Sequence, residues 1–96
     1  MPVTVMAVTS VNEENPEALS TYLYLTTPLI HQAGGRVVRS YTVKHSLEGG
    51  DQAQTVTLIE YPSQDVVDRL FNSSEYAAIR PIREQAFCNY QVSIVE

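Results

Sequence analysis

The chain has 96 residues, the size of one small domain, and its 44% hydrophobic and 18% charged residues are typical of a globular protein. Its net charge of −5 repels phosphate backbones and anionic lipid surfaces, so we expect neither nucleic acid nor a membrane as a partner. No apolar run approaches the ~18 residues of a membrane-spanning helix, and the amino end lacks the features of a secretory signal. We therefore expect a soluble, cytoplasmic protein.

The first third of the chain predicts a central strand followed by a helix. Residues 3–11 carry apolar side chains on both faces of an extended chain, which is typical of a strand covered on two sides. Asn15-Pro16-Glu17 supplies an N-cap, a first-turn proline and an acid that suits the helix dipole. The helix that begins here has an apolar stripe at three- and four-residue spacing and ends at Gly34-Gly35. Pro28 lies inside it and predicts a bend.

The middle of the chain predicts a β-hairpin. Residues 36–47 are rich in Val, Thr and Tyr, which favours a strand. Alternate positions on one face of this strand hold Val37, Arg39, Tyr41, Val43 and His45. Glu48-Gly49-Gly50-Asp51 predicts a turn, and residues 55–61 resume as a second strand, so the two should pair antiparallel.

The last third predicts two helical segments and a final strand. Pro62 ends the hairpin and Ser63 can cap the next helix. Asn72-Ser73-Ser74 interrupts that helix, and residues 75–87 continue as a second helical segment. Residues 90–95 alternate as a strand.

The element order predicts an α+β fold, the ferredoxin-like βαββαβ sandwich, as a single domain over residues 1–96. Right-handed crossovers place both main helices on one face of the sheet and the first and third strands at its centre. Because those central strands are apolar on both sides, including Met6 and Val8 on the outward side, something must cover the second face. A second copy of the same sheet is the simplest candidate, so we expect a homodimer.

A series of short motifs resembles the DUF1330 family of uncharacterised proteins across nearly the whole chain. They are Asn15-Pro16-Glu17, Tyr22, Gly34-Gly35-Arg36, Leu47-Glu48-Gly49, Tyr61-Pro62-Ser63, Asn72-Ser73-Ser74-Glu75-Tyr76 and Arg83. The resemblance implies a single DUF1330-like domain of the dimeric α/β barrel superfamily. That superfamily includes cofactor-independent monooxygenases of antibiotic biosynthesis, muconolactone isomerase-like enzymes and haem-degrading enzymes. The chain departs from the family after Arg36, where an aromatic residue and then a glycine pair are usual, so a ligand held by that strand can differ.

The tyrosines provide the candidate ligand site. Six of the eight aromatic residues are tyrosines, and a tyrosine combines an apolar body with a hydroxyl suited to a small polar aromatic ligand. We expect a pocket for a small organic acid or enolisable aromatic near Tyr22, His31, Tyr41, Tyr76 and Arg83. In this hypothesis Arg83 holds the anion and His31 is the candidate catalytic proton carrier. Burial of Tyr22 and Tyr76 in the core, a surface ion pair of Arg83 and a solvated His31 are the structural alternatives.

Two functions remain open at the level of sequence, and the sequence does not decide whether the protein is an enzyme. The first, implied by the resemblance, is a cofactor-independent small-molecule enzyme or binder, monooxygenase- or isomerase-like. The second is a non-catalytic dimeric ligand-sensing or accessory module, favoured by the lack of any catalytic motif. We expect no cofactor and no metal, and the lack of tryptophan disfavours the haem-degrading subclass. A cavity of about 300 Å³ or more would favour the first function.

Overall fold

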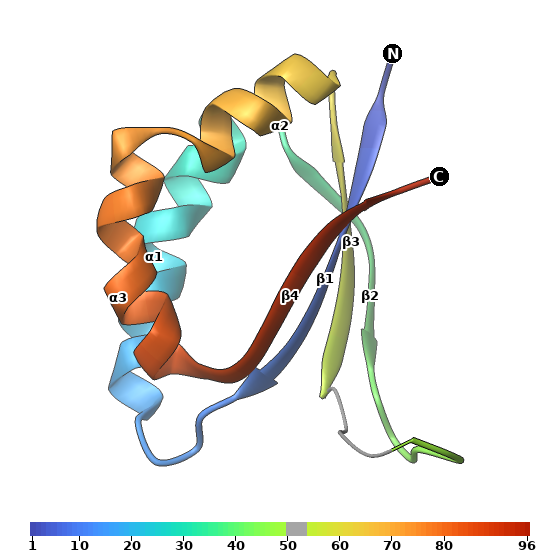
Figure 1. The fold of residues 1–96 in the computed structure, drawn as a ribbon, viewed down its shortest axis with the longest axis vertical. Helices are drawn as coiled ribbons and strands as arrows, with labels where there is room; N and C mark the ends of the chain where they lie inside the picture. Colours follow the sequence, from blue (N-terminus) through green and yellow to red (C-terminus); the bar gives the residue numbers. More distant parts are fainter. Residues whose placement is uncertain (50–53) are drawn as a thin grey trace.

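A four-stranded antiparallel sheet forms one layer of the molecule, and all the helices pack on one face of it (Figure 1). This computed structural model describes residues 1–49 and 54–96. The elements in chain order are β1 (Val3–Val11), α1 (Pro16–Gln32), β2 (Arg36–Thr42), β3 (Thr55–Tyr61), α2 (Gln64–Phe71), α3 (Ser74–Ala86) and β4 (Phe87–Val95). The sheet order is β2-β3-β1-β4, which confirms the ferredoxin-like fold with β1 and β3 at its centre. None of the helices described is long and apolar enough to span a membrane.

Local chemistry sets the helix boundaries. The side chains of Asn15, Ser63 and Ser73 each accept a hydrogen bond from a backbone N–H of the first turn, so the three helices begin where capping residues predict. Gly34, with φ at +78°, follows α1 and turns the chain into β2. Pro28 lies within α1, and the bend expected there stays a prediction.

Two strand boundaries differ from the sequence prediction. The second strand ends at Thr42, not at residue 47, and the last strand begins at Phe87, not at residue 90. Residues 50 and 51 of the predicted turn lie outside the described residues. The extra length of β4 comes from the early end of α3, because the backbone of Phe87 is already extended.

A β-bulge in β2 changes which side chains face the helices. Val37 pairs with Ile59, but Arg39 pairs with Leu58, so Val38 is the additional residue. The sequence prediction that Val37 and Tyr41 share a face is therefore wrong. Val37 faces the helices, whereas Tyr41 lies on the opposite face of the sheet.

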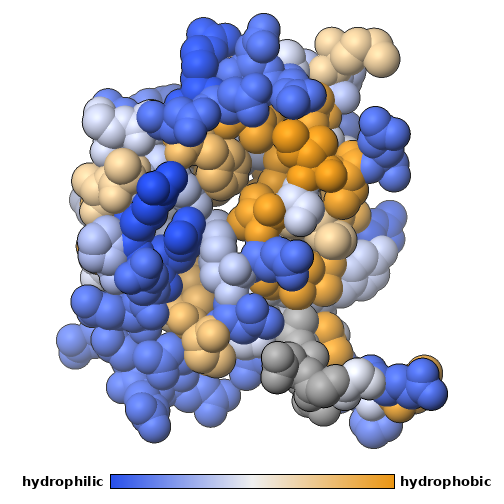
Figure 2. Space-filling model, in the orientation of Figure 1, coloured by the Kyte–Doolittle hydropathy of each residue, from blue (hydrophilic) through white to orange (hydrophobic). Residues whose placement is uncertain are grey.

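The layers meet in two hydrophobic clusters. Ala18, Tyr22, Ile79 and Ala86 form the first, where α1 packs on α3. The second joins the sheet to α2 and contains Val5, Tyr61 and Val67. Figure 2 shows a hydrophilic outer surface on the helix layer, hydrophobic side chains gathered at the sheet and a hollow between the two layers.

Candidate functional site

A cavity of about 440 Å³ lies between the inner face of the sheet and the helices. Most of its lining is aliphatic or aromatic, with β1 and β3 as its floor and α1 on the opposite side. Every polar side chain that lines it carries a hydroxyl group: Thr9, Tyr22, Thr26, Thr27, Thr55, Thr57, Tyr61, Tyr76 and Tyr90. The lining residues that the structure describes thus provide hydrogen bonds but no charge.

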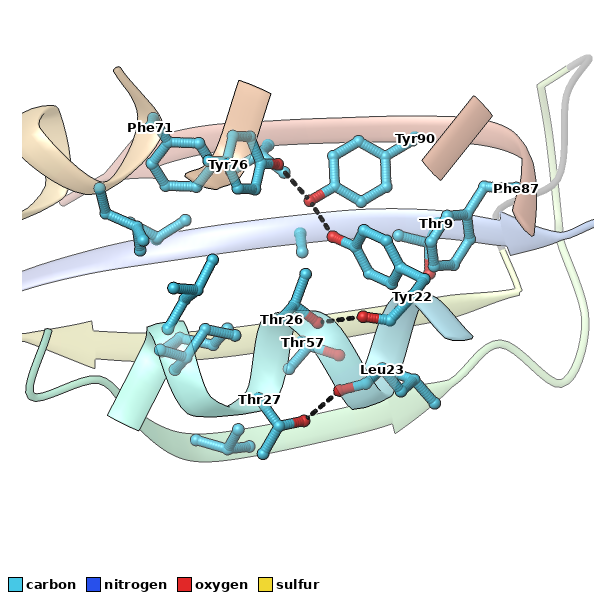
Figure 3. A pocket seen from close by; sticks show the side chains of 18 of the residues that line it. Thr9, Tyr22, Leu23, Thr26, Thr27, Thr57, Phe71, Tyr76, Phe87 and Tyr90 are labelled. Atoms are coloured by element: carbon cyan, nitrogen blue, oxygen red, sulfur yellow. Dashed lines mark hydrogen bonds between the residues drawn. The ribbon is translucent and has the colours of Figure 1, made fainter. Parts of the chain in front are cut away.

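The cavity opens between α1 and the edge strand β2. Leu23, Thr27 and Val37 are the exposed members of its lining, and they come from these two elements. Leu23 and Thr27 lie on the opposite side of the cavity from Tyr76 and Tyr90 (Figure 3). A ligand that enters at this mouth would pass apolar side chains before it reaches the tyrosines.

Three tyrosine hydroxyls meet inside the cavity, and we call Tyr22, Tyr76 and Tyr90 the tyrosine cluster. The Tyr90 hydroxyl lies 3.0 Å from that of Tyr22 and 3.2 Å from that of Tyr76, as the dashed lines in Figure 3 show. Nη1 of Arg83 donates to the Tyr76 hydroxyl at 3.2 Å, and the guanidinium carbon lies 4.8 Å from the centre of the Tyr90 ring. The cluster thus joins α1, α3 and β4, with a cation behind it.

Ring packing fixes the cluster in place. The Tyr22 ring meets Phe87 edge-on at 5.1 Å between ring centres, and Phe71 meets Tyr76 in the same way at 4.8 Å. Tyr22 and Tyr76 are also buried on the apolar stripes of α1 and α3. The hydroxyls are therefore held in position before any ligand arrives.

One hydroxyl proton of the tyrosine cluster takes part in no hydrogen bond within the cluster. Three hydroxyls carry three protons, and the two bonds between them use two. Arg83 only donates, so it takes none of these protons. Whichever way the hydroxyls turn, one O–H of the cluster has no acceptor among the residues described, and all three hydroxyl-bearing side chains line the cavity.

Tyr22 and Tyr90 are neutral at physiological pH. Burial raises the pKa of Tyr22 and of Tyr90, and the neighbouring phenols of the cluster raise that of Tyr90 further. Burial alone would lower the pKa of Arg83, but its hydrogen bond to Tyr76 raises it and the net change is upward. Tyr22 and Tyr90 therefore act as neutral hydrogen-bonding groups beside a permanent cation, and neither is a phenolate base.

Some threonine hydroxyls of the lining have a hydrogen-bond partner in the protein and others do not. Those of Thr26 and Thr27 donate to backbone carbonyls one helical turn earlier, and that of Thr57 lies 3.5 Å from a serine of β2. No hydrogen bond joins the side chain of Thr9 or Thr55 to another described residue. These two residues are cross-strand partners, so they add to the floor two adjacent hydroxyls that have no hydrogen bond to the residues described.

The structure brings together three of the five predicted site residues. Tyr22 and Tyr76 line the cavity, and Arg83 lies behind them without lining it. His31 is exposed in the last turn of α1 and is not part of the lining, so its expected position in the pocket is wrong. Tyr41, 51% exposed on the outer face of the sheet beside Arg39, is likewise not near the other candidates.

Helix geometry accounts for His31, as the bulge in β2 accounts for Tyr41. His31 follows Tyr22 by nine residues, which at about 100° per residue places it roughly half a turn around α1 from the cavity side. The sequence prediction missed Tyr90, the central member of the cluster. The sequence signal for Tyr90 was the alternation that places it on the same strand face as Val92. In the structure this face points to the helices, since Tyr90 pairs with Thr9 of β1.

Nothing in the described part of the chain resembles a metal centre. No group of three or more His, Cys, Asp or Glu side chains comes together among residues 1–49 and 54–96. The lining also contains no imidazole, carboxylate or thiol, so its described side chains include no group that titrates near neutral pH.

Comparison with known proteins identifies relatives by sequence and by fold. The DUF1330 family, described as a domain of unknown function, matches residues 4–96. A search of curated protein sequences found no match. Among solved structures, RPA0582 of Rhodopseudomonas palustris, a protein of unknown function, is 18% identical with a TM-score of 0.82, covering 98% of this chain and 80% of that one.

Two further structures share the fold at lower similarity. SnoaB of Streptomyces nogalater, a cofactor-independent oxygenase, is 12% identical with a TM-score of 0.67, covering 99% of this chain and 91% of that one. A dimeric protein of unknown function with a ferredoxin-like fold from Bacteroides fragilis is 11% identical with a TM-score of 0.63, covering 99% and 95%. At these identities the likeness concerns the fold.

Proposed function

Because this chain belongs to the DUF1330 family, which has no assigned function, we propose its function from its own cavity. The protein binds a small, largely apolar organic molecule that carries a carbonyl, enol or phenol oxygen. The observation that carries this proposal is the one hydroxyl proton that the tyrosine cluster cannot use internally, in a cavity of about 440 Å³ whose other walls are mostly apolar. That volume lies within the range of small-molecule sites.

The cavity favours a neutral ligand over a free carboxylate. A carboxylate placed among these walls would lose its hydration, and Arg83 does not line the cavity to compensate its charge. A carbonyl or phenol oxygen needs only one donor, which the tyrosine cluster has. Of the two ligand classes expected from the sequence, the enolisable aromatic therefore fits better than the small organic acid.

Binding is better supported than catalysis. An isomerase-like reaction needs a group that takes up a proton, and the described lining has none that titrates near neutral pH. An oxygenase activity is favoured by the likeness to SnoaB, a cofactor-independent oxygenase, which is a likeness of fold. We therefore infer a ligand-binding protein, with cofactor-independent oxygenation as the second candidate.

The outer face of the sheet supports self-association into a homodimer. Met6, Val8, Val56 and Leu58 share this face by the register of β1 and β3, and none of the helices that the structure describes covers it (Figure 1). Two similar structures, from Bacteroides fragilis and Thermobifida fusca, are described as dimeric. A second copy packed on this face would bury the apolar patch and leave the cavity on the inner face accessible.

A ligand screen tests the binding function. The purified protein is melted in the presence of aromatic ketones, phenols and aliphatic carboxylic acids, because a ligand that binds only the folded state raises Tm. We expect shifts with ketones and phenols. At least one of Tyr22→Phe, Tyr76→Phe and Tyr90→Phe should weaken binding of the best compound about tenfold.

The matched control is Tyr24→Phe, which makes the same chemical change at a side chain of α1 that is 80% exposed and outside the cavity. It should leave the affinity unchanged. Three cluster variants that all bind like the wild type would show that the tyrosine hydroxyls do not hold the ligand, and the proposed site would be wrong.

A further inference from the structure

Tyr61 carries a further cavity hydroxyl that has no hydrogen bond to another described residue, and it is separate from the tyrosine cluster. It is the last residue of β3, only 2% of its side chain is exposed, and it lines the cavity. No hydrogen bond joins its hydroxyl to any other residue that the structure describes. A nearly buried tyrosine usually has a partner for its O–H.

The Tyr61 hydroxyl opens on the cavity. Among the described residues, no side-chain polar atom that is fully buried lacks a hydrogen-bond partner. The unpaired oxygen of Tyr61 is therefore not enclosed by protein, and the open space that its side chain borders is the cavity. Burial raises the pKa of Tyr61, and the nearby Tyr76 raises it further, so this hydroxyl too is a neutral donor and acceptor.

Packing holds the Tyr61 ring in this position. It belongs to the buried cluster with Val5 and Val67, and its Cε1 would lie 2.8 Å from a Cβ placed on Gly35. Gly35 thus makes room for the ring, and a side chain at that position would displace it. Packing with Val5 and Val67 and the closeness of Gly35 therefore hold the ring on these sides.

The two polar sites come from opposite ends of the inner sheet face. Tyr90 pairs with Thr9 of β1, whereas Tyr61 pairs with Val3, six residues away on the same strand. Six residues of a strand span about 20 Å between Cα atoms, and the hydroxyls are closer together than this, because Tyr76 of the cluster is near enough to raise the pKa of Tyr61. The apolar Val5 and Ala7 line the floor between the two ends. One hydroxyl site therefore lies on each side of an apolar middle section.

We infer that the ligand carries two oxygen functions separated by an apolar ring system, one bound by the tyrosine cluster and the other by Tyr61. This inference rests on the proposed function and specifies its ligand class. A hydroxyl both donates and accepts, so the second function is a hydroxyl or a carbonyl. An apolar group placed there would leave the Tyr61 hydroxyl unpaired, and the site therefore discriminates against it.

The test compares 1-tetralone, a bicyclic ketone with one oxygen, with its 5-, 6- and 7-hydroxy derivatives. Affinities are measured by calorimetry for the wild type, Tyr61→Phe and Tyr41→Phe. We expect at least one hydroxy derivative to bind the wild type about three- to tenfold more tightly than 1-tetralone. Tyr61→Phe should abolish that preference, and Tyr41→Phe, which changes an exposed side chain of the outer face, should keep it.

The outcomes separate the inference from the function on which it rests. We call Tyr61, as the binding site for the second oxygen function, the second anchor. The second anchor is overturned if the preference for a hydroxy derivative persists in Tyr61→Phe or is absent in the wild type. Binding of 1-tetralone itself would in either case still support the proposed function. If neither 1-tetralone nor any derivative binds the wild type, the proposed function and this inference both fail. Tyr61→Phe retains the ring that packs against Gly35, so loss of the fold is not expected to obscure the result.

Discussion

Removing the hydroxyl of Tyr22 and that of Tyr61 should change the stability of the unliganded protein in different directions. The Tyr22 hydroxyl bonds that of Tyr90 at 3.0 Å in a buried setting. Tyr22→Phe removes this bond and leaves the ring packing in place, so the free energy of unfolding should fall by about 1 kcal/mol. In a domain of this size, 1 kcal/mol corresponds to a decrease in Tm of roughly 4–8 °C.

Tyr61→Phe removes a hydroxyl that has no hydrogen bond to any described residue. Its nearly complete burial deprives the hydroxyl of much of its hydration, which is a cost to the folded state. The variant should therefore unfold at the same Tm as the wild type or higher, with a gain of up to about 1 kcal/mol. A residue kept at the expense of stability is typical of a binding site.

Thermal and urea unfolding of both variants, measured at one protein concentration, tests this difference, because the proposed self-association would make stability depend on concentration. Tyr24→Phe, at an exposed position, is the control and should lie within about 0.5 kcal/mol of the wild type. If Tyr61→Phe lowers the stability as much as Tyr22→Phe does, its hydroxyl has a protein partner and the reasoning about the second anchor is refuted.

Three other predictions concern the interface, the packing of β2 and the response to alkali. Val8→Asp, on the outer face of the sheet, should give a monomer by light scattering at micromolar concentration, whereas Thr21→Asp on the exposed side of α1 should not. Gly35→Ala should lower the free energy of unfolding by about 1–3 kcal/mol in urea, because its methyl group would overlap the Ile30 side chain and the Tyr61 ring. The raised pKa values of Tyr22 and Tyr90 mean that the folded state keeps protons that the unfolded state loses near pH 10. The contribution of these two groups to stability should therefore be complete below about pH 10 and fall above it, and the phenolate absorbance of Tyr22 and Tyr90 should appear only with unfolding, not before it.

The fold follows from the sequence because its determinants are local. Capping side chains and apolar periodicity mark each helix, and Gly34-Gly35 marks the end of α1. The order of elements then leaves few antiparallel arrangements, and the observed sheet is the expected one. The bulge at Val38 is not predictable in this way, because an extra residue in a strand has no sequence signal comparable to that of a cap.

The site can be predicted from the sequence only in part, because it depends on which helix and strand faces come together in the fold. Tyr22 and Tyr76 lie on helix stripes that must face the sheet, so periodicity alone places them in the interior. Tyr90 comes to them through the pairing of β4 with β1, a long-range contact. Arg83 lies near the predicted partners, but whether its guanidinium enters the cavity or stands behind the tyrosines depends on a side-chain conformation that periodicity does not determine.

The chemistry of the lining limits what the protein can contribute to a reaction. A tyrosine hydroxyl whose pKa is raised by burial stays protonated near neutral pH and so does not act as a base, and it stabilises a developing negative charge on a ligand oxygen by donating a hydrogen bond. Arg83 strengthens such a bond through Tyr76, because a charged donor polarises the hydroxyls that follow it. If a bound molecule loses a proton here, the described side chains provide no base to take it up. The molecule must then be acidic enough to release that proton to water. The described side chains would then act by orienting the molecule and excluding water, which is also what a binding protein needs.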